Sequence, residues 1–168
     1  LAELLAAANW ADGVLLAGDL GRNSETAIVL EKFVAKHSGL LVLTKDAVDY
    51  FTSSPQSILS RPDTCLVLTV AQLQKLASHA GFTTAFTFSM DLLKFVEALH
   101  DFTHQHSISS IVKHLDTILV AVDGQVSSTK TAKDIEESWR VATAAHAAVW
   151  WLQGPSKPFE TITTAIAV

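Results

Sequence analysis

A short glycine turn, Gly18-Asp19-Leu20-Gly21, is the stretch of this chain best suited to ligand chemistry. It follows an apolar run at Gly13–Ala17 and precedes Ser24, where helical apolar spacing begins. A strand, a glycine turn and a helix in this order form the unit with which parallel α/β sheets present a ligand-binding edge. Glycine lets backbone N–H groups approach a ligand, and the helix N-terminus adds positive potential. The turn alone is a weak signal, because any tight strand-to-helix connection favours glycine.

Two histidines have the spacing of metal ligands. His100 and His104 are four residues apart, which places them on one face of a helix. In a zinc protease helix, the residue after the first histidine is a glutamate, whereas this chain has Asp101 at that position. The favoured interpretation is a solvated helix end, where histidines lie near the negative end of the helix dipole.

Single polar residues near strand ends leave two interpretations open. Lys113 contacts a nucleotide phosphate or is simply an exposed lysine at a strand end. Asp46 holds a substrate or caps its own helix, and the cap is favoured. The tryptophans Trp139, Trp150 and Trp151 suggest a binding surface, but in an alanine-rich helix they are more often packing anchors.

Composition excludes several classes of protein. The chain has 168 residues, of which 49% are hydrophobic and 17% charged, as expected for one domain with a sheet buried on both faces. A net charge of −5 argues against a nucleic-acid surface. The single cysteine, Cys65, is expected to be a buried thiol that forms no disulfide. The sequence contains neither a membrane-spanning apolar segment nor a recognisable signal peptide, so a cytoplasmic location is expected. The absence of an initial methionine suggests a fragment or a processed form.

The pattern of apolar residues along the chain predicts a single α/β domain over residues 1–168. Asp123-Gly124 is a strong hairpin signal, and the Thr-Phe alternation at Thr83–Phe88 suggests an edge strand for pairing with another subunit. Ser24 and Ser89 are the expected N-caps of two long helices. The predicted strands are Gly13–Ala17, Leu40–Thr44, Thr64–Thr69, Ile108–Val112, Thr117–Val122 and Gln125–Ser127, and the predicted helices include Leu1–Ala8, Ser24–His37, Asp46–Phe51, Val70–His79, Ile135–Gln153 and Phe159–Val168, with a polar loop at Lys130–Asp134.

Five segments, in order along the chain, resemble the ADP/ATP-dependent NAD(P)H-hydrate dehydratases. For example, Leu41–Val48 is similar to the family's LVLDADAL, and Asp12–Thr26 to its ADAVVIGPGLG…ET segment. The other three are Leu66–Leu76, Ile111–Gly124 and Leu152–Glu160. The resemblance implies a three-layer ribokinase-like sandwich: a mostly parallel sheet with helices on both faces and a C-terminal antiparallel hairpin. It lacks the family's N-terminal portion and so covers roughly the last two-thirds of a dehydratase.

What this family does sets the functional expectation. Its members phosphorylate the hydroxyl of hydrated NADH or NADPH with ADP or ATP, and elimination then regenerates the cofactor. A Gly-Thr-Gly-Asp motif opens the large C-terminal helix, where backbone N–H groups hold the transferred phosphate and the aspartate acts as base. The resemblance therefore implies ADP or ATP, with magnesium, as the possible cofactors.

The chain departs from the family at that motif. Counting back from Gln153-Gly154, the motif falls on Ser138-Trp139-Arg140-Val141. Val141 cannot accept a proton. Trp139 and Arg140 would crowd an anion pocket that glycines leave open. In the glycine turn, Asp19 stands where its charge would repel phosphate.

Two hypotheses follow. The first is a degenerate ribokinase-like domain, a non-catalytic binding or structural subunit, because the catalytic position is Val141. The second is an active dehydratase or small-molecule kinase, whose base comes from Asp19 or a partner chain. Either way, a homo-oligomer or a partner subunit is expected, because much of the chain is apolar. No metal ligand is assigned, and the candidate binding residues for a nucleotide or substrate are Gly18, Asp19, Gly21, Asp46, Thr69, Lys113 and Arg140.

Overall fold

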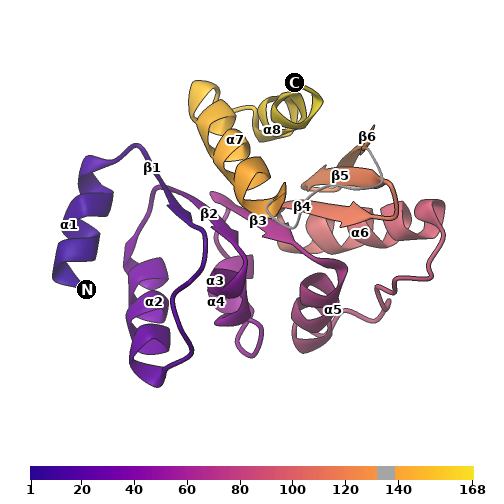
Figure 1. The fold of residues 1–168 in the computed structure, drawn as a ribbon. Coiled ribbons are helices and arrows are strands. Elements are labelled where there is room, and N and C mark those ends of the chain that lie inside the picture. Colours follow the sequence, from indigo (N-terminus) through magenta and orange to yellow (C-terminus); the bar gives the residue numbers. More distant parts are fainter. Residues whose placement is uncertain (132–138) are drawn as a thin grey trace.

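A six-stranded sheet organises the chain (Figure 1). The computed structural model describes residues 1–131 and 139–168. The strands lie in the order β1-β2-β3-β4-β5-β6; β1 to β4 are parallel to one another, and the pairs β4-β5 and β5-β6 are antiparallel. This confirms the predicted α/β class and its hairpin. The strands are β1 (Gly13–Leu16), β2 (Leu40–Thr44), β3 (Thr64–Leu68), β4 (Ser109–His114), β5 (Thr117–Val122) and β6 (Gln125–Lys130).

Helices cover both faces of the sheet, as expected. One face packs against the helices that lie between Leu1 and β4, and the other packs against the last two helices. The helices of the first layer are α1 (Ala2–Trp10), α2 (Ser24–Lys36), α3 (Asp46–Asp49), α4 (Gln56–Leu59), α5 (Val70–His79) and α6 (Leu92–His106). Those of the second layer are α7 (Trp139–Gln153) and α8 (Pro158–Ala167).

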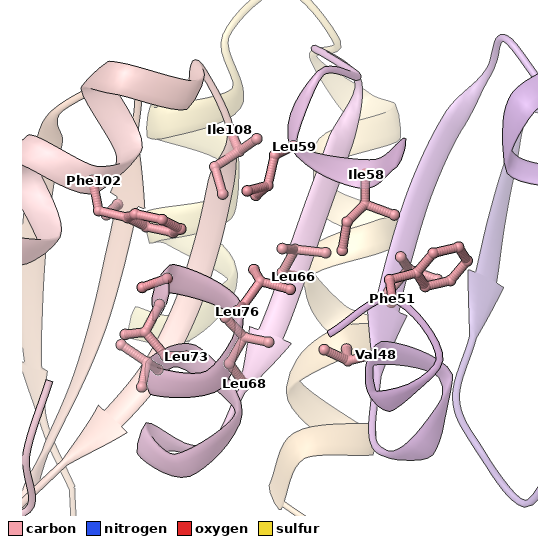
Figure 2. Close-up of a cluster of buried hydrophobic side chains, with 14 of the residues drawn as sticks. Val48, Phe51, Ile58, Leu59, Leu66, Leu68, Leu73, Leu76, Phe102 and Ile108 are labelled. Atoms are coloured by element: carbon pink, nitrogen blue, oxygen red, sulfur yellow. The ribbon is translucent and has the colours of Figure 1, made fainter. Parts of the chain in front are cut away.

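The core splits into two clusters because side chains alternate across each strand. In β3, Leu66 and Leu68 face the first layer, whereas Cys65 and Val67 face α7 and α8. Figure 2 shows the first cluster, where Leu66 and Leu68 meet apolar side chains of α3, α4, α5 and α6. β3 is buried along its whole length, as expected for a central parallel strand.

The structure corrects two predicted helix caps. The N-cap of α2 is Asn23, whose side chain accepts a hydrogen bond from the Thr26 N–H at 2.7 Å, so Ser24 is already inside the helix. The N-cap of α6 is Asp91, whose carboxylate accepts from the Lys94 N–H, so Ser89 is not a cap. Asn23 directly precedes Ser24, and Asp91 lies two residues after Ser89, so in each case a second good capping residue competes with the serine and caps the helix.

Thr83–Phe88 is not a strand. The segment is an irregular connection between α5 and α6. Phe86 is buried, and its ring lies edge-on to Phe95 at 5.3 Å and to Phe102 at 6.0 Å. The alternation of Thr and Phe therefore arises from an aromatic anchor in the core, with no edge available for pairing at this point.

The hairpin turn forms as predicted. Asp123 and Gly124 both have positive φ, 45° and 84°, the conformation of a two-residue turn between antiparallel strands. β6 continues to Lys130, three residues beyond the predicted Ser127, because it pairs with β5 back to Thr117. Most of the predicted loop Lys130–Asp134, and the predicted helix start at Ile135, lie outside the described residues.

Candidate functional site

The candidate residues gather at the carboxyl edge of the sheet, the side at which the parallel strands β1 to β4 end. This is where α/β folds bind ligands. Gly18–Gly21 follow β1, Asp46 follows β2, and Thr69 follows β3. The C-terminal half of α7 packs beside the amino ends of β1 and β2. The helix therefore runs antiparallel to these strands, and its first turn lies near their carboxyl ends.

Asp46 holds the glycine turn in place. Its two carboxylate oxygens accept hydrogen bonds from the Asp19 N–H at 2.8 Å and the Leu20 N–H at 3.1 Å. Gly18 makes this approach possible: its φ is +110°, and a Cβ there would lie 2.2 Å from Asp46 Oδ1. The favoured interpretation of Asp46 as a helix cap is wrong, because α3 begins after Lys45 and has no side-chain cap. Its carboxylate instead stabilises the turn.

Asp19 and Lys45 face each other across the turn. Both are non-glycine residues with positive φ, 57° and 54°, a conformation that costs energy for an L-residue. Lys45 Nζ lies 3.8 Å from Asp19 Oδ1, and the Asp19 side chain is 95% exposed. The Tyr50 hydroxyl donates a hydrogen bond to the Gly21 carbonyl oxygen, which fixes the far end of the turn. The negative charge of Asp19 is therefore partly balanced by Lys45.

Thr69 is occupied in a capping box. Its hydroxyl accepts from the Gln72 N–H, and the Thr69 N–H donates to Gln72 Oε1, each at 3.1 Å. Gln72 also donates through Nε2 to the Lys45 carbonyl oxygen at 2.8 Å and to Asp49 Oδ1 at 3.0 Å. Sequence reasoning missed Gln72 as a link between β2 and β3, although the Thr-x-x-Gln spacing is a capping-box signal.

The first turn of α7 completes this edge. Arg140 donates through Nη1 to Gln72 Oε1 at 3.3 Å, which connects α7 to the capping box of α5. Trp139 is partly buried against the cluster between the sheet and α7. Val141 is the next residue, and the described helix Trp139–Gln153 contains no aspartate or glutamate. Ser138, the first residue of the aligned motif, lies outside the described residues.

Lys113 and His114 end β4 with their side chains on opposite faces. Ile111 belongs to the cluster on the α7 face, so Lys113, two residues further, faces the same layer. His114 faces the other layer, where its ring stacks on Phe95 at 4.1 Å and its Nε2–H donates to the Met90 carbonyl oxygen at 2.7 Å. His114 is thus a buried anchor for the start of α6, whereas Lys113 points toward the side of the sheet from which Arg140 comes.

An open hollow of about 390 Å³ lies beside the glycine turn. Its lining comes from Gly21 to Ser24, from the segment between Asp46 and Thr52, and from Lys75 of α5. Of the candidate residues, it brings together Gly21 and Asp46 only; Thr69, Lys113 and Arg140 lie outside its lining. The sequence candidates therefore share an edge without lining one cavity.

His100 and His104 lie exposed toward the C-terminal end of α6, as expected, and each ring also has a partner in the neighbouring hairpin. His100 Nδ1–H donates to the Gly124 carbonyl oxygen at 2.5 Å, and His104 Nδ1 lies 3.4 Å from Asp123 Oδ1. Both rings therefore contact the turn between β5 and β6. Within residues 1–131 and 139–168, no group of three or more histidine, cysteine or acidic side chains is placed to hold a metal ion. In that same part of the chain, no helix is both long and apolar enough to cross a membrane.

Comparison with known proteins identifies the fold. No protein-family model matches the chain, and no curated protein matches it. A ribokinase-like superfamily protein from Enterococcus faecalis superposes with a TM-score of 0.74 at 16% identity, over 98% of this chain and 55% of that one. A Bacillus subtilis pyridoxal kinase, solved as an ADP complex, gives 0.62 at 10% identity, over 94% of this chain and 62% of that one. A Staphylococcus aureus pyridoxal kinase, solved with AMP-PCP and pyridoxal, gives 0.66 at 14% identity, over 98% and 63%.

The chain therefore has the ribokinase-like fold, shared with these three proteins. It spans between 55% and 63% of their lengths. Identities of 10% to 16% establish the architecture and leave the chemistry to the residues of the site itself.

Proposed function

We propose that this chain is a ribokinase-like domain, related to the NAD(P)H-hydrate dehydratases, that does not catalyse by itself and serves as a binding or structural subunit. The observation that carries the proposal is the first turn of α7. In the alignment, Val141 stands where the family has its base, and Arg140 stands where the family has a glycine. Arg140 is hydrogen-bonded to Gln72 in this structure.

These two replacements bear on both parts of the chemistry. Phosphoryl transfer depends on positioning and on charge stabilisation. A positioned base typically contributes about 10²- to 10⁴-fold in rate. One oxyanion-type donor contributes about 10²- to 10³-fold. Val141 removes the first contribution, and a side chain as large as Arg140 obstructs the close approach on which the second depends.

Residual nucleotide binding is compatible with this loss. Arg140 and Lys113 are cations on the same side of the sheet at its carboxyl edge, and either attracts a phosphate as a point charge. In the described part of the chain, no cluster of three or more histidine, cysteine or acidic side chains offers a site for a resident magnesium ion, and Asp46 and Asp49 already accept hydrogen bonds from two backbone N–H groups and from Gln72. We therefore propose weak binding of ADP or ATP without turnover. The cytoplasmic location remains a prediction.

The test is an absorbance assay at the reduced-nicotinamide band with hydrated NADH and either ADP or ATP. We expect no nucleotide-dependent recovery of NADH. Restoration of activity by the double substitution Val141→Asp with Arg140→Gly would directly support the proposal, and the control Arg22→Gly, at an exposed position of the glycine-turn segment, should restore none. Recovery of NADH by the unmodified chain would refute the proposal.

The second candidate is an active dehydratase or small-molecule kinase completed by a partner chain. Its specific support is the fold shared with the pyridoxal kinases, together with the presence of Lys113 and Asp46 at the edge. Calorimetry with ADP and ATP separates the two: sub-micromolar affinity that depends on Lys113 favours the second, and weak or absent heat favours the first.

A further inference from the structure

Gln72 joins the two helical layers at the carboxyl edge of the sheet. It lies in the first turn of α5, it is 7% exposed, and α5 covers the face of the sheet opposite to α7 (Figure 1). Its amide nevertheless reaches Arg140 in the first described turn of α7, with Arg140 Nη1 3.3 Å from Gln72 Oε1. The other bonds of the amide tie it to Lys45, Asp49 and Thr69. One buried side chain therefore holds together the segments that follow β2 and β3 and the start of α7.

The nitrogen end of the Gln72 amide is fixed by two acceptors. Nε2 has two hydrogens, and it donates to the Lys45 carbonyl oxygen at 2.8 Å and to Asp49 Oδ1 at 3.0 Å. A carbonyl oxygen and a carboxylate can only accept, so they determine which end of the amide faces them. The oxygen end then points toward Thr69 and Arg140. The position of Oε1 is therefore set by bonds that do not involve α7.

The oxygen end of the amide has more donors nearby than it needs. Oε1 accepts from the Thr69 N–H at 3.1 Å and from Arg140 Nη1 at 3.3 Å, and the Thr69 hydroxyl lies 3.5 Å away. If Arg140 moves away, Oε1 keeps the bond from the Thr69 N–H, so no buried acceptor is left without a partner. The bond from Arg140 to Gln72 can therefore be broken at little cost.

A phosphate group is a stronger acceptor for the same guanidinium. The amide of Gln72 is neutral, and it accepts from Arg140 through Nη1 alone. A phosphate is charged, and a guanidinium can donate to it through two parallel N–H groups. A phosphate that reaches the start of α7 therefore takes the guanidinium from Gln72. The amide itself stays in place, because its bonds to Lys45, Asp49 and Thr69 are not affected.

We propose that Gln72 is the positioning residue for Arg140. Gln72 holds the guanidinium at the carboxyl edge until a nucleotide binds, and a phosphate group of the nucleotide then replaces Gln72 as the acceptor. This inference rests on the weak nucleotide binding proposed above, and it adds that the affinity for the phosphate group depends on how tightly residue 72 holds Arg140. A stronger acceptor at position 72 weakens nucleotide binding.

An exchange of the side chains at positions 49 and 72 tests this dependence. The double substitution Asp49→Asn with Gln72→Glu leaves the net charge of −5 unchanged and keeps a donor and an acceptor between the two positions, but it places a carboxylate beside Arg140. NMR titrations with ADP and with adenosine measure the dissociation constants. We expect the exchange to raise the ADP dissociation constant about five- to ten-fold, and to change that of adenosine, which has no phosphate, by less than about two-fold.

Two further variants separate the charge from the fold. Asp49→Asn alone is the control, and it should not weaken ADP binding, because it only removes a negative charge. Arg140→Met should itself raise the ADP dissociation constant, and in that background the exchange should change it by less than about two-fold. An equal effect of the exchange with and without Arg140 would overturn the proposal. An unchanged ADP affinity in the exchange variant, or a parallel loss of ADP and adenosine binding, would overturn it too, since the latter indicates a role in the fold alone.

The unmodified chain provides a test that does not depend on the stability of any variant. ADP should shift the Arg140 Nε–H resonance, and adenosine should not. If ADP binds without this shift, or if the chain binds no ADP, the role of Gln72 is refuted while the absence of catalysis still stands. Recovery of NADH from its hydrate would instead refute the proposed function, so the two failures are distinguishable.

Discussion

His106 carries a pH dependence that can be worked out from its surroundings. It is the last residue of α6, and its ring lies 4.9 Å from that of Phe102. Its Nε2 is buried and, among the described residues, has no hydrogen-bond partner. Burial lowers the pKa of His106 below the ordinary value for histidine, because the charged imidazolium loses hydration there.

The sign of the resulting effect on stability is fixed by linkage. A base whose pKa is lowered in the folded state is protonated first in the unfolded chain, so acid stabilises the unfolded state. The contribution of neutral His106 is complete above about pH 6.5 and decreases as the pH falls through that value toward the lower pKa of the folded protein.

We therefore predict that His106→Gln reduces the loss of unfolding free energy between about pH 7 and pH 5.5. Urea denaturation at a series of pH values measures this slope. The control is His146→Gln, at an exposed position of α7, which should leave the slope as it is in the unmodified chain. An unchanged slope in the His106 variant would show that its ring is hydrated in solution.

At the scale of elements, the connection from β1 to α2 depends on one glycine. Gly18 has φ +110°, and a Cβ at this residue would lie 2.2 Å from Asp46 Oδ1. A methyl group there would have to displace the carboxylate that accepts the Asp19 and Leu20 N–H groups. Hydrogen bonds to charged acceptors contribute about 1.5–3 kcal/mol each.

We predict that Gly18→Ala lowers the free energy of unfolding by about 2 kcal/mol more than Gly81→Ala does. Gly81 is a matched control, because it also has positive φ, +78°, but no atom lies within 4 Å of its expected Cβ. The two variants share the backbone cost of an alanine at positive φ and differ in the clash with Asp46. Equal losses in chemical denaturation would indicate that the turn rearranges at little cost.

The elements themselves were largely predictable, and the reason is their apolar pattern. β2, β5 and α5 match their predicted bounds, because runs such as Leu40–Thr44 and the helical spacing of Val70–His79 leave little choice of period. The ends of the elements were harder to predict: Asn23 caps α2, where Ser24 was expected. The helix α4 was missed because four residues are too few to show a helical spacing of apolar side chains.

At the scale of the whole molecule, the sequence predicted which residues lie at the carboxyl edge of the sheet, but it did not predict the hydrogen bonds that these residues form. The order of parallel strands places Gly18, Asp46 and Thr69 together. The bond from Arg140 to Gln72 joins residues 68 positions apart, and no local pattern contains it. The same holds for Arg61, whose guanidinium donates to the Gly39 carbonyl oxygen at 2.7 Å and the Thr64 hydroxyl at 2.9 Å across the amino edge. Such contacts depend on tertiary packing.

The two layers are expected to unfold together as one domain. Trp151 of α7 is 1% exposed. It belongs to the buried cluster between the sheet and the helices α7 and α8, together with Cys65 and Val67 of β3. Burial is complete enough there to raise the pKa of the Cys65 thiol to about 12. Trp150, its neighbour in sequence, is 36% exposed. One tryptophan is therefore a packing anchor, and the other lies at the surface of the helix.

We predict that Trp151→Ala lowers the free energy of unfolding by about 3–5 kcal/mol, the usual cost of removing a buried large aromatic side chain. Trp150→Ala, the matched control, should cost about 1 kcal/mol or less. Differential scanning calorimetry should show a single transition in all three proteins, moved to a lower temperature by Trp151→Ala. Because β3 has one face in each core cluster, loosening α7 must also weaken the face that packs on α5 and α6. Two separated transitions in the Trp151 variant would mean that α7 and α8 unfold independently of the first layer, and that residues 1–168 do not behave as one cooperative unit.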